Sequence, residues 1–463
     1  MHFIMSNSNH RKGNLLLLSG IAWLAICGAS CRTTRPLSVD YGREAFLRGD
    51  YESSKDLLDQ AMDEQIKVTQ KSQVRRAADV LNKAAVSQGE YEPMFRDAFQ
   101  TYFYLALNHL GQGNSGGALA ELEAMSSRLW DPLYAQAQGW EEGAKEYGNE
   151  MENALAQRGN SQTEADYRKC WQEHQDWLNF ADQSANAALA RCCNPASCLL
   201  GAFLAGLANK EADRRDDRTF TFLGKVFDSG LAQETCGRIS NGLKSPQGLD
   251  NKVLVIVASG KGPVLAARKV GVGFMTVFSF TSLPEEKEAM RAENGAFDPD
   301  ASPVTVWVDD GPTETEVAAK MYEGLALEFA ARERRLFWEQ FSRIFIRDAA
   351  VVAGSQVGAK MVGDDHAVAK NVIRFGVPAI WLFARQFDWN MKPDLRCMQR
   401  SPWLYRVALV DIPKDRTLTL TSESPNDGEI QVVIPDGWIS AVLYVDFHGH
   451  DGGVWNPLLL KAK

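Results

Sequence analysis

Three stretches between residues 39 and 241 share one pattern, in which two runs of helical spacing are separated by a short turn. Apolar residues recur every three or four positions in each run, which predicts a helix with one apolar face. The turns fall at Gly49-Asp50, at Gly111–Gly117 and at Asp213–Asp217. Because a helix pair buries its apolar face only against a neighbour, the pattern predicts a stack of helical pairs.

These pairs resemble tetratricopeptide repeats, which are helix–turn–helix units of about 34 residues. Tyr51 begins the second helix of the first pair, and Asn194-Pro195 precedes the third pair. The spacing between the pairs is irregular, so long intervening helices are expected to add to the stack. A generic helical bundle with glycine turns is the alternative.

Residues 1–31 have the order of an export signal rather than of a folded element. Arg11 and Lys12 supply a basic start, residues 15–26 form an apolar run, and Gly28-Ala29-Ser30 precedes Cys31. The alternative is an uncleaved membrane anchor, because the uncharged stretch is just long enough to span a bilayer. Both interpretations place the residues after Arg32 outside the cytoplasm.

The segment that ends at Cys31 resembles the lipobox of bacterial lipoproteins, although Gly28 stands where that family usually has leucine. The resemblance implies removal of residues 1–30 and acylation of Cys31, whose acyl chains would hold the protein on the membrane. Arg32 stands where an aspartate would favour the inner membrane, so the resemblance implies the periplasmic face of the outer membrane.

A chain of 463 residues is long enough for two or three domains. We expect an α+β protein with a signal over residues 1–30, a helical domain over 31–245, a mixed region over 246–400 and a small β module over 401–463. The expected strands are 252–258, 272–281, 303–309, 405–410, 417–421, 429–433, 439–445 and 455–460, and the expected helices of the mixed region are 313–331, 333–362 and 367–387.

The sequence resembles a family of uncharacterised bacterial tetratricopeptide-repeat lipoproteins over the larger part of the residues after Cys31. The resemblance rests on Gly260-Lys261-Gly262-Pro263-Val264 after an apolar strand, and on Asp394-Leu395-Arg396-Cys397 followed by Arg406–Val410. The helical pairs at Gly49-Asp50-Tyr51 and Asn194-Pro195 support it further. Cys397 and Pro402-Trp403 depart from the family pattern. The resemblance implies a periplasm-facing outer-membrane lipoprotein and no particular enzymatic activity.

The charge balance argues against nucleic acid as a partner. The formal net charge is −9, and the sequence has no basic block that could follow a phosphate backbone. An acidic protein also gains little from anionic lipid, which leaves the acyl chains on Cys31 as the expected membrane anchor.

Four cysteines of the helical half are disulfide candidates: Cys170, Cys192, Cys193 and Cys198. An oxidising periplasm would allow them to pair, and buried thiols are the alternative. Their spacing matches no common zinc pattern, because no second C-x-x-C pair and no nearby histidine accompanies them.

Asp446, His448 and His450 follow the expected strand 439–445 at alternate positions. Alternate residues of a strand share one face, so these three side chains are weak candidates for a divalent metal site. The alternative is a polar, solvent-facing strand end. We expect no cofactor and identify no catalytic group.

The preferred functional hypothesis is a non-enzymatic scaffold that binds other envelope proteins through its helical pairs. One alternative is a metal-dependent envelope enzyme that uses Asp446, His448 and His450. Another is a glycan-binding scaffold, with peptidoglycan as its partner, that reads sugars through Trp438, Trp455 and Tyr444.

Overall fold

The computed structural model describes the chain in a series of residue ranges. They are 37–69, 95–130, 195–212, 217–245, 247–272, 276–295, 298–300, 302–309, 311–326, 329, 355–357, 359–361, 371–376, 397–423, 428–448 and 454–462. The expected signal, Cys31, and the expected helix 333–362 apart from 355–357 and 359–361 lie outside them.

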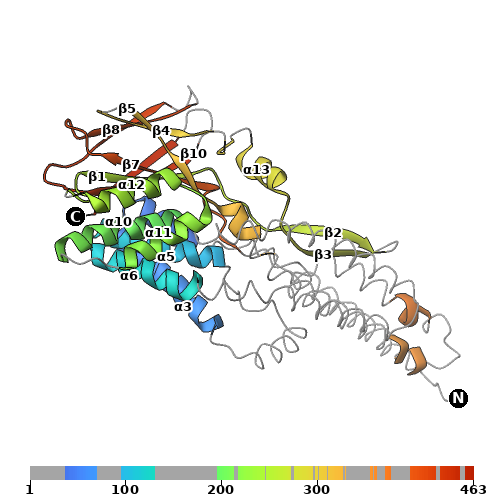
Figure 1. Ribbon diagram of the computed structural model, residues 1–463. Helices are drawn as coiled ribbons and strands as arrows, with labels where there is room; N and C mark the ends of the chain where they lie inside the picture. The colour runs from blue at the N-terminus through green and yellow to red at the C-terminus, as the bar shows by residue number, and fades with distance from the viewer. Residues whose placement is uncertain are drawn as a thin grey trace, which may run out of the picture.

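The described residues form three layers, with helices on one face of a first sheet and a second sheet on its other face (Figure 1). The first sheet has the strand order β11-β10-β1-β7-β6. Its strands are β1 (Lys252–Ser259), β6 (Glu316–Lys320), β7 (Leu404–Asp411), β10 (Ala441–His448) and β11 (Val454–Lys461).

Strand β1 lies at the centre of the first sheet, and both of its faces are covered. It runs parallel to β10 and antiparallel to β7, and its residues 253–258 are all buried. Leu254, Ile256 and Ala258 belong to the core beneath the helices. Val253, Val255 and Val257 belong to the core between the two sheets. A continuous apolar run is therefore what a strand covered on both faces requires.

The second sheet has the order β5-β4-β8-β9 and is antiparallel throughout. Its strands are β4 (Val304–Val308), β5 (Gly311–Glu314), β8 (Thr417–Ser422) and β9 (Glu429–Val433). One face packs on the first sheet, and alternate residues point away from it. Apolar and polar residues therefore alternate along the sequence of strands such as β4 and β8.

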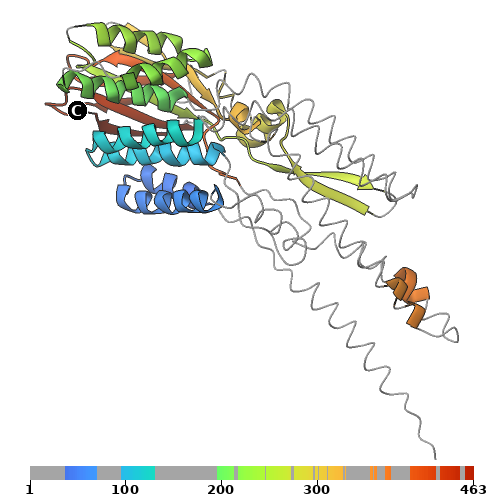
Figure 2. The same cartoon turned by 60° about the horizontal axis from the view of Figure 1, so that its bottom comes forward.

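Six of the described helices form three hairpins, two of them at the predicted turns Gly49-Asp50 and Gly111–Gly117 and the third on either side of residues 213–216. They are α2 (Ser38–Leu47) with α3 (Tyr51–Thr69), α5 (Phe95–Gly111) with α6 (Ser115–Met125), and α10 (Pro195–Ala212) with α11 (Asp217–Ser229). Figure 2 shows the hairpins side by side in chain order, and α3 packs on α5 while α6 packs on α10. The predicted helical pairs are thus confirmed as hairpins.

The first two hairpins turn in the same way. Gly49 and Gly113 have positive φ values of 74° and 75°, a conformation that glycine adopts without strain after the last turn of a helix. The next residue then caps the second helix, because Asp50 Oδ1 accepts from the Ser53 amide and Asn114 Oδ1 from the Gly117 amide.

The hairpins have an inner and an outer row of helices. Helices α2, α5 and α10, together with α12 (Gln233–Lys244), lie against the first sheet. Helices α3, α6 and α11 form the second row, farther from the strands (Figure 2). The inner row is therefore covered by the first sheet, and the outer row is the side of the hairpins that faces away from it.

Residues 266–272 and 276–294 form a smaller unit beside the two packed sheets. Strands β2 (Ala266–Val272) and β3 (Thr276–Ser282) form a two-stranded ribbon that projects from the body in both views, next to α13 (Glu286–Asn294). The structure also contains two short π-helical segments, η1 (Ser126–Trp130) and η3 (Val372–Gly376).

Most of the expected strands are confirmed, and three expectations in the second half are corrected. The expected helix 313–331 begins as β5 and β6, and among its described residues 321–326 and 329 are helical. The expected strand 272–281 is mostly the second half of a hairpin. The expected strand 439–445 starts at Ala441 and continues to His448.

The C-terminal strands do not stand alone. Strands β7, β10 and β11 join β1 and β6 in the first sheet, while β8 and β9 join β4 and β5 in the second. Residues 401–463 therefore build their β structure jointly with residues 252–320. The mixed α and β composition is as expected for the α+β class.

Candidate functional site

The structure places Asp446 in the interior, where it is 1 % exposed. One of its carboxylate oxygens lies 2.6 Å from Arg43 Nη2 of helix α2. His448 is the last residue of β10, and His450 lies outside the described residues. The expectation of a solvent-facing strand end is therefore wrong for Asp446. A metal ion next to this carboxylate would meet the positive charge of Arg43.

Arg43 joins three tyrosines as well as Asp446. Its Nε donates to the Tyr104 hydroxyl at 2.9 Å, which in turn lies 3.1 Å from the Tyr444 hydroxyl and 3.3 Å from the Tyr405 hydroxyl. These side chains come from the inner helices α2 and α5 and from strands β7 and β10. The Arg43 guanidinium therefore links helices α2 and α5 to the first sheet.

Burial shifts the pKa of two tyrosines of this cluster. It raises the pKa of Tyr405 and of Tyr444 well above its ordinary value. Burial opposes the charge on Arg43, but Tyr104 and Asp446 outweigh it and raise the pKa of Arg43 well above its ordinary value. Arg43 therefore stays charged, and Tyr405 and Tyr444 stay neutral, near neutral pH.

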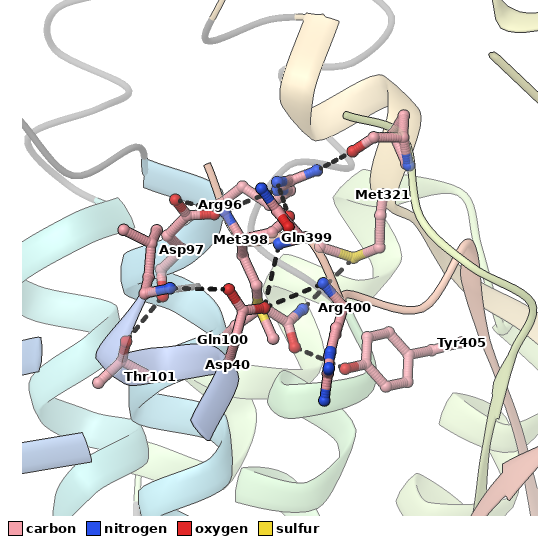
Figure 3. A network of polar contacts seen from close by, with 12 residues as sticks. Asp40, Arg96, Asp97, Gln100, Thr101, Met321, Met398, Gln399, Arg400 and Tyr405 are labelled. Atoms are coloured by element: carbon pink, nitrogen blue, oxygen red, sulfur yellow. Dashed lines mark hydrogen bonds and ion pairs between the residues drawn. The ribbon is translucent and has the colours of Figure 1, made fainter. Parts of the chain in front are cut away.

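A second set of contacts, shown in Figure 3, clamps residues 397–400 against the helices. Asp40 Oδ1 accepts from the amides of Gln399 and Arg400 at 3.0 and 2.9 Å, and Asp97 Oδ2 accepts from the amide of Met398 at 3.1 Å. Burial raises the pKa of Asp40, and these backbone donors oppose that shift.

Arg96 completes the clamp from the start of α5. It donates to the carbonyl oxygens of Pro263 at 2.6 Å and of Met398 at 2.8 Å (Figure 3). Gln100, one turn along α5, accepts from the Tyr405 hydroxyl at 2.6 Å and thereby links the clamp to the tyrosines. We call Arg43, Asp446, the three tyrosines, Gln100 and the clamp residues Asp40, Arg96 and Asp97 the polar junction.

The polar junction brings together the two segments that carry the family resemblance. Arg96 touches Pro263 of the glycine-rich segment and Met398, next to Cys397 of the later segment. The Gly262 amide donates to the Ser401 carbonyl at 2.6 Å. The described contacts of Gly262 and Pro263 with Arg96 and Ser401, and of Met398 with Arg96, therefore hold helices and sheet together.

Gly262 is required by this close approach. A Cβ at this position would overlap the Ser401 hydroxyl and would lie 2.6 Å from the Pro402 carbonyl oxygen.

Gly262→Ala is expected to lower the free energy of unfolding by about 1–3 kcal/mol, because the two backbone segments must move apart. Gly224→Ala is the control, since a Cβ in α11 meets nothing within 4 Å, and helix propensity should make it neutral or stabilising. Urea unfolding of both variants checks this, and equal stability of the two would contradict it.

The cysteines that the structure describes are buried. They are Cys198, Cys236 and Cys397, and burial raises the pKa of Cys236 to about 12 and that of Cys397 to about 11. A thiol with such a pKa is a poor nucleophile at neutral pH. Cys170, Cys192 and Cys193 lie outside the described residues, so the disulfide expected in the helical half stays a prediction.

One serine has the sequence spacing of a hydrolase nucleophile but lacks its structural context. Gly113-Asn114-Ser115-Gly116-Gly117 matches G-x-S-x-G. A nucleophile elbow joins a strand to a helix, whereas this segment joins α5 to α6. The Ser115 hydroxyl donates to the Ala462 carbonyl at 2.7 Å, which fastens the hairpin to the C-terminus of the chain.

The outer helix α11 carries an apolar stripe formed by Phe220, Gly224 and Phe227. Their spacing of four and three places them on one face of the helix. Phe220 is 56 % exposed and Phe227 is 49 % exposed. Gly224 leaves open backbone between the two rings, since a Cβ there has no neighbour within 4 Å.

Of the aromatic residues proposed as sugar contacts, Tyr444 is fully buried in the polar junction. Trp455 is partly buried and stacks on Phe447, with ring centroids 4.2 Å apart. Trp438 is partly buried against the core between the sheets. None of these three offers an exposed ring face as large as that of Phe220.

The residues that the structure describes contain no group of three or more histidine, cysteine, aspartate or glutamate side chains arranged to hold a metal ion. Among the helices that the structure describes, none has both the length and the apolar character needed to cross a membrane.

Comparisons with known proteins give the following result. No family model matches this chain, no curated protein is significantly similar to it in sequence, and no solved structure is significantly similar to it in fold.

Proposed function

We propose that this protein is a lipid-anchored, periplasm-facing scaffold of the cell envelope, which binds a protein partner through the outer row of its helical hairpins. The observation that carries the proposal is the apolar stripe of α11. Two half-exposed phenylalanines on either side of an open backbone position offer a partner two ring anchors and a recess between them. Such a helix face fits helix-in-groove recognition.

The stack of hairpins supports a repeat-like solenoid as the architecture behind this function. Three hairpins follow one another in chain order, and adjacent hairpins pack on each other. The inner row is occupied by the first sheet, so a partner meets the outer row instead.

The stripe is tested with a photo-crosslinking amino acid placed at position 220 or 227. The expected result is a crosslink to one discrete envelope protein from both positions. Position 221, which is exposed on the side of the same helix, is the matched control and should give no such product. Equal crosslinking from position 221, or none from positions 220 and 227, would contradict the proposed surface.

The anchor is tested separately, with Cys31→Ser. We expect the variant to lose incorporation of labelled palmitate and to leave the membrane fraction or stall as precursor, because the thiol that receives the lipid is gone. Palmitate labelling of the wild-type chain and of a Cys27→Ser control should be unchanged. Labelling that persists in Cys31→Ser would overturn the lipobox assignment.

A further inference from the structure

The outward face of the second sheet is mainly polar, and its two exposed large apolar residues are Trp307 on β4 and Val433 at the end of β9. The strand register aligns one row of Pro312, Trp307, Thr419 and Gln431 across the four strands. The next row is Glu314, Thr305, Thr421 and Glu429. This sheet is the layer farthest from the helices (Figure 1), so its outer face lies on the other side of the molecule from the stripe of α11.

Trp307 is held in place on this face. Its indole Nε1–H donates to the Thr421 hydroxyl at 3.0 Å, and Thr421 lies in the row beside that of Trp307. The bond directs the indole across strand β8, while the residue remains 46 % exposed. A ring fixed by its own hydrogen bond loses little conformational entropy when a ligand covers it.

The groups around Trp307 define the chemistry of a ligand. Thr305, Thr419 and Thr421 supply hydroxyls, and Gln431 supplies an amide. The neighbouring row ends in a carboxylate on both sides, at Glu314 and Glu429, and neither row contains lysine or arginine. Anionic ligands such as nucleic acid or acidic lipid are repelled by this arrangement, whereas a neutral ligand rich in hydroxyl groups is accepted.

We infer that this face binds a neutral glycan chain, with one sugar ring stacked on Trp307. The C–H face of a pyranose is apolar and packs on an indole, while its rim of hydroxyls meets donors and acceptors in the plane of the sheet. A row across four strands spans about 14 Å, which gives the face the length of an extended oligosaccharide. The site is independent of the α11 stripe and uses none of the aromatic residues expected from the sequence.

Calorimetric titration with the hexamer of N-acetylglucosamine and with cellohexaose tests the inference. We expect the intact protein to bind at least one of these glycans, and Trp307→Ala to weaken binding at least tenfold. Trp307→Phe, which retains a ring but loses the anchoring N–H, should fall between the two. Phe220→Ala, an exposed aromatic residue on α11, is the matched control and should bind like the wild type.

The outcomes separate this site from the proposed scaffold function. Loss of glycan binding in Trp307→Ala with an unchanged crosslink from position 220 supports two independent surfaces. Failure of the intact protein to bind either glycan or purified peptidoglycan overturns the inference, as does tighter binding of heparin than of the neutral glycans. A protein partner crosslinked through position 307 also overturns it. Unchanged thermal unfolding of Trp307→Ala shows that any loss is local.

Discussion

Arg43→Ala is expected to lower the free energy of unfolding by about 3–5 kcal/mol, which is a large part of the stability of most folded domains. The substitution leaves the carboxylate of Asp446 in a dry interior without the charge that compensates it. It also removes the Nε–H that donates to Tyr104. Urea unfolding followed by tryptophan fluorescence gives the change directly.

Arg218→Ala is the matched control for this prediction. Arg218 pairs with Glu123 at 2.9 Å between α11 and α6, but both side chains are exposed. An exposed ion pair contributes little because water and salt screen it, so the loss should not exceed about 1 kcal/mol. The prediction is contradicted if the two arginine variants lose similar amounts of stability.

Phe103→Ala is expected to cost about 3–5 kcal/mol, because it empties a large volume between α5 and the first sheet. Phe103 is fully buried, and its ring meets that of Tyr405 at 5.4 Å between centroids with an interplanar angle of 78°. Edge-to-face contact adds to the burial of apolar surface. The urea concentration at the midpoint of unfolding should fall, while the slope of the free energy of unfolding against urea concentration stays unchanged.

Phe227→Ala is the matched control, because it makes the same substitution on the outer row of helices. Phe227 is about half exposed on α11, so its loss should change stability by no more than about 0.5 kcal/mol. Its effect should appear instead in partner crosslinking from position 220. A cost for Phe227→Ala as large as that for Phe103→Ala would mean that the stripe is buried in the folded protein.

The helical hairpins could be predicted because their signals are local. A glycine followed by Asp50 or Asn114 ends one helix and caps the next, and both residues act within one turn of the chain. The buried strand β1 was equally clear, because its apolar run has no polar position for solvent. These signals do not depend on distant residues.

The region 313–331 was predicted as a helix because Glu316–Lys320 consists largely of residues with high helix propensity. In the structure this segment is β6, which pairs with β7 at the edge of the first sheet. The alanines Ala318 and Ala319 are buried there. Pairing with a strand more than eighty positions away therefore outweighs local propensity, and no periodicity in the segment reveals it.

The polar junction could be predicted only in part. The sequence indicates Asp446 only as a weak candidate for a metal ligand, because its partner Arg43 is 403 positions away. One signal was present in the sequence, because Arg43 lies on the same face of α2 as Val39 and Phe46, with a spacing of four and three. A charged residue within an apolar stripe indicates a buried partner. The identity of that partner follows only from the fold.

The most direct test of how the hairpins dock on the first sheet is a double-mutant cycle between Arg43 and Asp446. Arg43→Met, Asp446→Leu and the double variant are compared with the wild type in urea unfolding. If α2 and β10 meet as described, the double variant is more stable than the sum of the single changes predicts, with a coupling of at least about 1 kcal/mol. Additive effects within about 0.5 kcal/mol would show that the two residues do not meet and would contradict the docking of the helices on the sheet.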